Sequence, residues 1–394
     1  MLLVNKDPNN PICYFAETNF RNTKDRFGIF MRDRMYHFYI IGRSGSGKST
    51  LLHTKMKNDI IQNNGFCLID PHTDLVKNVY QSIPPHKREK VLYLDASKTT
   101  TLGYNPLKKV SYEKRALVAS SILEIFERIW GRQGWGVKLS HLLRNAILCL
   151  TDQPNANFAD ILKLLQDKNY RNSCIQNIEN PTVKQFFEKE FNTYTKSDLL
   201  PVFNKIGGLL SYPSVYRILV TNKEQISLRS IMDNQKILLV NLAKGSIGNE
   251  PSQILGGLLL ISLANAGFSR VDIPQHKRKP FFVYADEFQE YSGLTLAEML
   301  SQLRKFQLGL VLAHQYGSQL DPKVRDAILS NVGTIVSFRL GQVDARTMEK
   351  EFAPIFSASD FVNLANYDVY LKMMIRGVPS VAFSARTLEP EDIY

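Results

Sequence analysis

A glycine-rich stretch between an apolar run and a helix-compatible segment constrains this chain most. Residues 42–49 read Gly-Arg-Ser-Gly-Ser-Gly-Lys-Ser and follow the apolar residues Phe38 to Ile41. The spacing Gly-x-x-x-x-Gly-Lys-Ser is that of the phosphate-binding P-loop, which connects a strand to a helix. Glycines let such a loop aim N–H groups at a phosphate, and the following helix adds the positive end of its dipole. The stretch therefore predicts a strand, a phosphate-binding loop and a helix.

Each residue type in this loop suits one part of a nucleotide. Lys48 is expected to reach the β- and γ-phosphates, and the Ser49 hydroxyl is expected to ligate Mg²⁺. The alternative is a glycine-rich turn that merely contains a lysine, and the full spacing between a strand and a helix argues against it. The predicted nucleotide-binding set is Gly42, Arg43, Ser44, Gly45, Ser46, Gly47, Lys48, Ser49 and Thr50.

Short apolar segments alternate with helix-compatible segments along most of the chain. Such alternation is typical of a parallel, doubly wound sheet. We therefore predict an α/β fold, a RecA-like P-loop NTPase with a mainly parallel, twisted sheet. The expected strands cover residues 38–42, 66–70, 91–95, 236–241, 281–285, 308–313 and 334–339.

The pattern changes between the third and fourth of these strands. Runs such as 116–130 and 139–150 carry apolar residues at helical spacing. We predict an inserted all-α domain at residues 111–232. It would separate an N-terminal part of the ATPase domain, residues 1–110, from a C-terminal part, residues 233–394.

The charge balance favours a polyanionic partner. The chain has 49 Lys and Arg against 37 Asp and Glu, which gives a net charge of +12. Such an excess suits nucleic acid or an anionic membrane face, although a host with a basic proteome would produce it too. The predicted partner is DNA, bound without sequence specificity.

Cysteine usage and hydropathy indicate a reducing compartment. The four cysteines contain no C-x-x-C pair, so we expect reduced thiols rather than a disulfide or zinc framework. The first ten residues show no signal peptide, and the apolar stretch Ile254 to Phe268 is expected to be a buried helix too short for a membrane span. We expect a cytoplasmic protein without a transmembrane segment of its own.

A P-loop predicts a second motif, an apolar strand that ends in an acidic residue. Residues 280–287, Pro-Phe-Phe-Val-Tyr-Ala-Asp-Glu, supply it. Asp286 is the expected Mg²⁺ ligand, and Glu287 is the expected general base for the attacking water. A surface carboxylate pair is the alternative. Asp70 and Asp95 also end strands and are rival ligands, although each lacks an adjacent Glu and suits a turn or capping role.

The strand after this motif ends at His314 and Gln315. We expect it to lie between the two motifs, so that Gln315 senses the γ-phosphate; a backbone-bonded glutamine is the alternative. His314 is expected to be structural. Arg304 precedes the strand and suits either of two roles, a trans-acting arginine at a neighbour's γ-phosphate or a cation at a helix C-terminus. Arg339 and Arg346 are weaker candidates for the first role.

Three stretches of the chain form a recognisable combination. They are Ile41-Gly-Arg-Ser-Gly-Ser-Gly-Lys-Ser-Thr-Leu, Gly65-Phe-Cys-Leu-Ile-Asp-Pro-His-Thr-Asp, and Tyr284-Ala-Asp-Glu-Phe with Leu303-Arg-Lys-Phe-Gln-Leu-Gly-Leu-Val-Leu-Ala-His-Gln. Together they resemble the conjugative coupling proteins of type IV secretion systems, the TraD/TraG type, within the HerA/FtsK superfamily. The resemblance covers most of residues 25–385. Membrane-anchored members carry N-terminal transmembrane helices, and none is visible in this sequence.

This resemblance implies a hexameric ring that binds ATP and Mg²⁺, hydrolyses ATP and moves DNA through a central channel. It makes Arg304 the preferred trans-acting arginine. Relaxase or secretion-channel proteins become expected partners, and the inner face of the cell membrane becomes an expected docking place. The resemblance assigns the roles given above to Lys48, Ser49, Asp286, Glu287 and Gln315.

Two functions compete at this stage. The first is an ATP-hydrolysing DNA translocase, and the second is a nucleotide-gated adaptor that docks secretion substrates without moving DNA. A kinase-like phosphotransferase is disfavoured, because the Asp-Glu pair and the following glutamine favour water as the nucleophile. Two roles are open for four residues of the insertion: they contact DNA or cargo, or they only pack between helices and lie in a solvated loop. The residues are Trp130, Arg132, Trp135 and Lys138.

Overall fold

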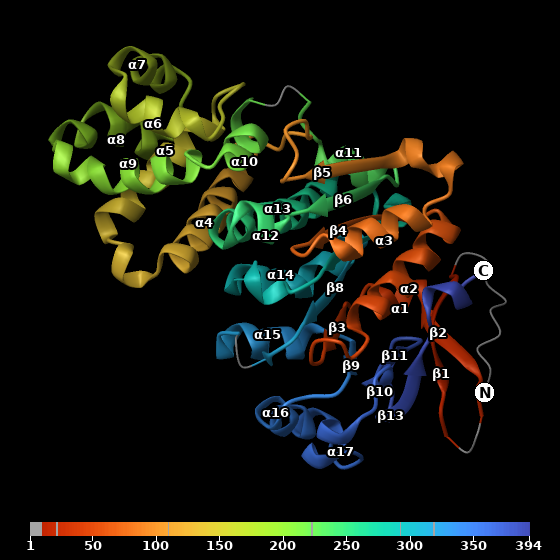
Figure 1. Cartoon of the computed structure of the whole chain (residues 1–394). Helices are drawn as coiled ribbons and strands as arrows, with labels where there is room; N and C mark the ends of the chain where they lie inside the picture. Colours follow the sequence, from red (N-terminus) through yellow and green to blue (C-terminus); the bar gives the residue numbers. More distant parts are fainter. Residues whose placement is uncertain (1–9, 21–22, 109, 222–223, 292, 318–319) are drawn as a thin grey trace. The chain divides into compact units, whose positions relative to one another are not determined.

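The computed structural model divides the chain into two compact units (Figure 1). The first contains Met1–Leu92, Leu228–Asn241 and Ala266–Tyr394, and the second contains Tyr93–Ser227 and Leu242–Asn265. The predicted three-part division stays a prediction. The structure describes residues 10–20, 23–108, 110–221, 224–291, 293–317 and 320–394.

The first unit is built on a sheet with the strand order β2-β1-β13-β10-β9-β3-β8-β7-β4-β6. The chain passes from the first unit into the second within β5 (Val91–Asp95). A separate small hairpin joins β11 (Met374–Ile375) to β12 (Val378–Pro379). The sheet strands are β1 (Ile12–Thr18), β2 (Arg26–Phe30), β3 (Phe38–Ile41), β4 (Gly65–Asp70), β6 (Ile237–Asn241), β7 (Phe281–Ala285), β8 (Leu308–His314), β9 (Thr334–Ser337), β10 (Asp368–Lys372) and β13 (Phe383–Thr387).

The middle of this sheet is parallel. β3 pairs in parallel with β8 and β9, and β7 pairs in parallel with β4 and β8. Every residue of β3, β7 and β8 is buried, as in parallel strands covered on both faces. β1, β2, β10 and β13 extend the sheet as antiparallel strands. The mainly parallel sheet is therefore confirmed, and the carboxyl ends of its central strands meet at one edge.

Helices cover both faces of this parallel region. The crossover from β3 through α2 to β4 runs toward one end of the sheet, and those through α14 and α15 run toward the other. Because parallel crossovers are right-handed, this reversal places α2 opposite α14 and α15. The helices of the unit are α1 (Met31–Arg34), α2 (Lys48–Gln62), α3 (Asp74–Ser82), α11 (Leu228–Asp233), α14 (Leu294–Leu303), α15 (Pro322–Asn331), α16 (Gln342–Phe352) and α17 (Ala358–Asn363).

The second unit is mainly helical, as the apolar periodicity predicts. Its aromatic and aliphatic residues pack between helices, with Phe126, Phe158, Leu142 and Leu143 fully buried. Its helices are α4 (Tyr112–Trp130), α5 (Val137–Thr151), α6 (Ala159–Gln166), α7 (Lys168–Gln176), α8 (Pro181–Glu188), α9 (Lys196–Leu210), α10 (Pro213–Tyr216), α12 (Lys244–Ile247) and most of α13 (Asn249–Phe268).

The apolar helix α13 is longer than predicted. Helical structure continues over Asn249–Asp272, and by length and composition this segment is sufficient to cross a membrane. The expectation that the stretch is too short for a span is therefore wrong. Of its most apolar window, 67% is buried inside the protein, which is the packing of a core helix.

Candidate functional site

The glycine-rich loop has the backbone that its sequence predicts. Gly45 and Gly47 adopt φ angles of 73° and 121°, a region that favours glycine. A Cβ atom on Gly47 would lie 2.9 Å from Cδ1 of Tyr367, and one on Gly42 would lie 2.5 Å from Cβ of Phe338. At these two positions the close contacts leave room only for glycine. The loop that connects β3 to the first turn of α2 therefore packs closely against Phe338 and Tyr367.

Lys48 begins α2 and is 5% exposed. Its ammonium donates hydrogen bonds to the carbonyls of Gly42, at 2.7 Å, and Arg43, at 3.1 Å. Burial lowers the pKa of Lys48, while Glu287 and Asp286 raise it. The loop thus holds a buried cation beside two carboxylates.

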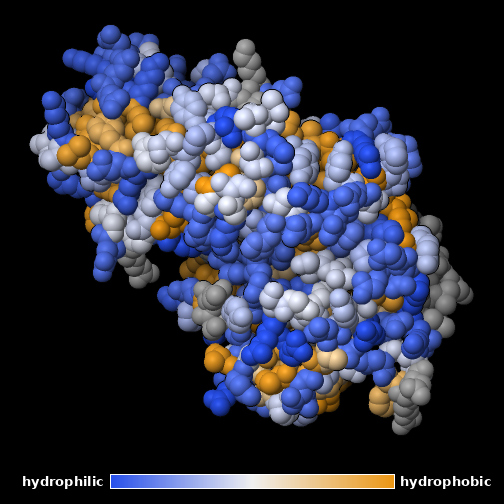
Figure 2. All heavy atoms as spheres, in the orientation of Figure 1, coloured by the Kyte–Doolittle hydropathy of each residue, from blue (hydrophilic) through white to orange (hydrophobic). Residues whose placement is uncertain are grey.

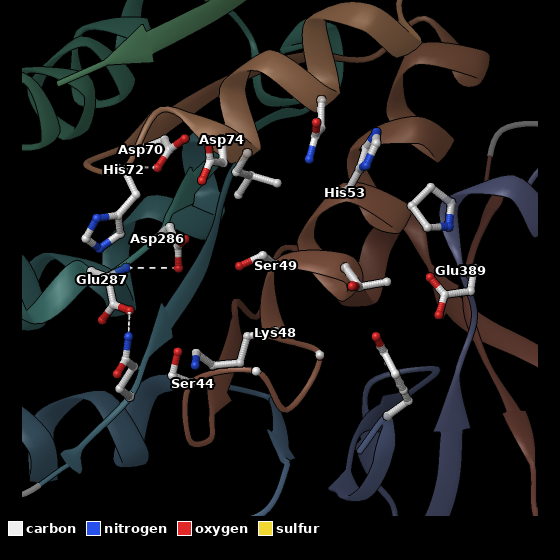
Figure 3. A pocket seen from close by; sticks show the side chains of 18 of the residues that line it. Ser44, Lys48, Ser49, His53, Asp70, His72, Asp74, Asp286, Glu287 and Glu389 are labelled. Carbon is white, nitrogen blue, oxygen red and sulfur yellow. Dashed lines mark hydrogen bonds between the residues drawn. The ribbon is translucent and has the colours of Figure 1, made fainter. Parts of the chain in front are cut away.

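Asp286 and Glu287 follow β7 directly. Figure 3 shows Asp286 facing Ser49 across the cavity. Burial is the largest cause that raises the pKa of Asp286 to about 7; Glu287 and Asp70 raise it further, and Lys48 opposes them. Three carboxyl groups, those of Asp286, Glu287 and Asp70, therefore lie close to one buried lysine, Lys48.

Two glutamines hold the Glu287 carboxylate. Gln315 Nε2 donates to Oε1 at 2.5 Å, and Gln289 Nε2 donates to Oε2 at 2.7 Å. β8 lies between β3 and β7, so Gln315 stands between the two phosphate motifs as expected. The alternative of a glutamine bonded to backbone is not observed, because its amide binds a side chain.

His314 is buried beneath Gln315 and shares a hydrogen bond with the Tyr39 hydroxyl. Burial, followed by the positive charge of Lys48, lowers the pKa of His314 to about 3. The imidazole therefore stays neutral near pH 7. A neutral, buried ring bonded to Tyr39 agrees with the structural role expected for His314.

The rival aspartates have turn-forming roles. Asp70 accepts hydrogen bonds from the backbone N–H groups of His72, at 2.8 Å, and Val76, at 2.9 Å. Asp95 accepts from both the N–H and the hydroxyl of Ser97. Asp70 also lines the cavity, where burial raises its pKa, and its negative charge when ionised raises the pKa of Asp286.

The cavity has a volume of about 470 Å³. Ser44, Gly45, Gly47, Lys48, Ser49 and Thr50 of the predicted binding set line it, with Asp286, Glu287 and Gln315. Gly42, Arg43 and Ser46 are not lining residues and support the loop instead. Arg43 N–H bonds to the Arg339 carbonyl, and the buried Ser46 hydroxyl donates to the Arg43 carbonyl at 2.7 Å.

A second wall of the cavity comes from parts of the chain that carry no motif. The N–H of Tyr367 bonds to the Ser46 carbonyl at 2.9 Å, and Thr54 on α2 donates to the Leu388 carbonyl at 2.8 Å. These bonds bring the C-terminal segment to the P-loop, and Figure 3 shows Glu389 near His53, away from Asp286. Two further lining residues, His72 and Asp74, lie in the stretch 65–74 that carries the family resemblance, although no role was predicted for them. The lining residues that the sequence did not indicate are His53, Leu75, Asn78, Tyr367, Glu389, Pro390 and Glu391.

Arg304 lies away from this cavity. It precedes β8, whereas Gln315 follows it, and a strand of seven residues spans roughly 23 Å. Its guanidinium carbon is 3.6 Å from the centre of the Tyr36 ring. Arg304 therefore sits at the amino edge of the parallel strands, where it does not reach the site of its own chain. Arg339 follows β9 at the carboxyl edge, and Arg346 is exposed on α16.

The aromatic residues singled out in the helical unit pack against that unit. Trp130 stacks on Phe126 with ring centres 4.6 Å apart, and its indole N–H donates to Glu250. Trp135 lies beside Trp130, with ring centres 6.0 Å apart. Lys138 donates to Asp198 at 2.8 Å. The side chain of Arg132 lies outside the described residues.

No protein-family model matches this sequence, and no curated protein does. Solved structures share its fold. The plasmid coupling protein TrwB, in complex with the ATP analogue ADPNP, is 15% identical with a TM-score of 0.66, over 95% of this chain and 89% of TrwB. TrwB in complex with ADP and Mg²⁺ is 14% identical with a TM-score of 0.65, again over 95% of this chain and 89% of TrwB. VirB4 of Thermoanaerobacter pseudethanolicus is 14% identical with a TM-score of 0.64, over 99% of this chain and 100% of VirB4.

These likenesses establish the fold. The chain has the α/β P-loop NTPase architecture of TrwB and VirB4 along most of its length. The predicted fold class is confirmed, and so is the predicted resemblance to conjugative coupling ATPases at the level of structure.

Proposed function

We propose that this chain is an ATP-hydrolysing motor subunit of a type IV secretion or conjugation system. One observation carries the proposal: Gln315 holds Glu287 at the carboxyl edge of the sheet, in the same cavity as Lys48, Ser49 and Asp286. The fold adds support, since TrwB has been solved with an ATP analogue and with ADP and Mg²⁺.

The residues of the cavity fit ATP and Mg²⁺. The positive-φ glycines leave backbone N–H groups free to approach phosphates, and Lys48 adds a positive charge. Ser49 and Asp286 would hold Mg²⁺, which commonly takes one or two protein oxygens beside those of the phosphates. Burial holds the pKa of Asp286 near 7, so a bound cation would relieve an unfavourable buried charge. When bound, Mg²⁺ neutralises the charge of the phosphates.

Glu287 would take the proton from the attacking water. A general base must be fixed within hydrogen-bond reach of the proton that it removes, and both oxygens of this carboxylate are fixed by glutamine amides. Gln315 approaches Glu287 from between the two motifs, so it would orient both the carboxylate and the water. Neutral His314 would keep the end of β8 in place through Tyr39.

The proposal extends to a hexameric ring that moves DNA or a nucleoprotein substrate, with relaxase or secretion-channel proteins as partners. The net charge of +12 supports DNA as the polyanionic partner, and the protein would contact its phosphate backbone. Arg304, held away from its own cavity, would act at the site of an adjacent subunit. The protein would work in the cytoplasm, docked at the inner face of the membrane.

Two variants test the site. Lys48→Ala and Glu287→Gln should both abolish hydrolysis, but only Glu287→Gln should keep tight ATP binding, because it removes the base and leaves the phosphate cradle intact. Nucleotide binding and phosphate release would be measured on each. A Glu287→Gln protein that still moves DNA would contradict the motor. Normal ring assembly and cargo binding with slow turnover indifferent to DNA would favour the adaptor instead.

A further inference from the structure

Lys55 is a buried lysine on α2 that the proposed function does not use. Its side chain is 0% exposed, and its ammonium lies 3.9 Å from the centre of the Phe38 ring and 5.0 Å from that of Phe15. Within the part of the chain that the structure describes, the hydrogen-bonding partner of its Nζ is the Cys13 thiol, at 4.0 Å. Burying an ammonium without a carboxylate is unfavourable.

The nearby carboxylate already has other partners. Asp59 accepts two hydrogen bonds from Arg34, each of 2.7 Å, and a third from the Tyr284 hydroxyl. Lys55 is therefore an excess positive charge beside a matched ion pair. Four titratable groups face it: Cys13 from β1, Arg34 from α1, Asp59 from α2 and, beyond Asp59, Tyr284 from β7.

Burial favours the neutral, nucleophilic form of the Lys55 amine. Burial is the largest cause that lowers its pKa, Arg34 lowers it further, and Cys13 and Asp59 oppose them, leaving a value of about 8. Near pH 8 about half of the side chain is a neutral amine, whereas an exposed lysine would be almost fully charged. A neutral amine next to a thiol can react once that thiol is oxidised.

We propose that Cys13 and Lys55 form a covalent sulfur–nitrogen cross-link when the protein meets a peroxide. Hydrogen peroxide first converts the Cys13 thiol to a sulfenic acid and releases one water. The Lys55 amine then attacks the sulfur, an S–N bond forms, the S–O bond breaks, and the hydroxyl leaves with one amine proton as a second water. Sulfur loses two electrons to the peroxide, and the product has two hydrogens fewer than the reduced pair.

The cross-link would join β1 to α2, two elements that pack directly on each other. α2 begins with Lys48 and Ser49, so the bond would fasten the helix of the nucleotide cavity to the antiparallel edge of the sheet. A thiol would reverse the reaction by restoring Cys13 and the free amine. This inference stands on the contact of Lys55 with Cys13 and does not depend on the proposed function.

The test uses the full-length protein and an internal control. Cys13 and Cys67 on β4 are both 0% exposed, but burial alone raises the pKa of the Cys67 thiol, and among the described residues no amine is bonded to it. The protein would be treated with hydrogen peroxide at pH 7 and pH 8.5, digested and analysed by peptide mass spectrometry. The expected product joins the peptides of Cys13 and Lys55, forms several-fold faster at pH 8.5 and disappears with dithiothreitol, while Cys67 stays reduced.

Two variants sharpen the result. Lys55→Arg keeps the positive charge without a nucleophilic amine, so Cys13 should oxidise onward without a cross-link, and Cys13→Ser should give no product. The wild-type measurement decides the question even where a variant fails to fold. Oxidation of Cys13 without attachment to Lys55, equal oxidation of Cys13 and Cys67, or a product whose rate ignores pH would each overturn the proposal.

Discussion

Two buried groups of charges flank α2, and they are built differently. In the first, Arg34 and Asp59 form two parallel hydrogen bonds, and the Tyr284 hydroxyl and the Asn64 amide also donate to the carboxylate. In the second, Asp286 lies beside Glu287 and Asp70, while Lys48 donates its hydrogen bonds to loop carbonyls. In the first group the opposite charges of Arg34 and Asp59 balance each other, and both oxygens of the carboxylate are hydrogen-bonded within the chain. The second carries an excess of negative charge that a cation would balance.

The pKa values of the two groups follow the same division. Asp59 raises the pKa of Arg34 above its ordinary value even though burial opposes it. At the cavity, burial and neighbouring carboxylates raise the pKa of Asp286, and no partner reverses this. Removing one member of a matched buried pair destabilises a fold, whereas unmatched buried charges in a cavity indicate a candidate ligand site. The contrast explains why one group is structural and the other is the candidate site.

The largest effect should follow from breaking the matched pair. Arg34→Met leaves Asp59 buried without its partner, and removing one member of such a pair typically destabilises by about 3–5 kcal/mol. Urea denaturation would measure the loss of unfolding free energy. The matched control is Arg26→Met, because Arg26 pairs with Asp392 at the surface, with side chains 47% and 37% exposed. Equal losses for the two variants would contradict the comparison.

Replacing a charged residue of the cavity should instead increase the free energy of unfolding. The folded-state pKa of Asp286 is about 7 against an ordinary 3.8, so its protonation stabilises the fold below pH 4 and that contribution is lost as the pH rises through 7. Asp286→Asn should therefore raise the unfolding free energy at pH 8, without nucleotide, by up to about 4 kcal/mol. The gain should vanish near pH 4, and hydrolysis should be lost. A variant less stable than wild type at pH 8 would show that Asp286 is matched after all.

Gln315 should affect rate rather than stability. Gln315→Ala frees one oxygen of Glu287, and misplacing a catalytic group in this way lowers kcat by about 10–100-fold. Steady-state hydrolysis and equilibrium ATP binding would be measured together, with binding expected to stay within a few-fold of wild type. A loss confined to ATP affinity would mean that Gln315 holds the nucleotide and not the base.

The smallest effect is expected at Lys138 in the helical unit. Its pair with Asp198 is solvent-exposed, with the lysine side chain 74% exposed, so Lys138→Ala should leave the free energy of unfolding nearly unchanged. If this surface follows DNA, the variant should bind DNA more weakly and reduce the salt dependence of binding by about one ion. Unchanged DNA binding at every salt concentration would leave Lys138 with a structural role alone.

The sequence was sufficient where a local pattern carries the chemistry. The P-loop spacing, the strand ending at Asp286 and Glu287, and the strand ending at Gln315 predicted both motifs and the strand between them. The second wall of the cavity was not predictable in this way. Tyr367 and Glu389 come from a segment more than 300 residues beyond the loop, and only the antiparallel strands β10 and β13 bring it there.

Residue type also misled in places where burial decides the role. Ser46 lies within the motif, but its hydroxyl turns inward to the Arg43 carbonyl. Helix α13 begins before the apolar stretch that predicted it, and helical structure also includes polar residues beyond the other end of that stretch. Lys55 looks like an ordinary helix residue in the sequence, and only the packing of β1 and β3 against α2 reveals it as buried.

The rate of ATP hydrolysis with and without DNA, measured at low and high salt, decides whether this chain is a DNA motor. We expect Mg²⁺-dependent hydrolysis that DNA accelerates at low salt, that high salt suppresses, and that Glu287→Gln abolishes while ATP remains bound. Hydrolysis at the same rate with and without DNA, together with no salt-dependent DNA binding, would contradict a DNA motor.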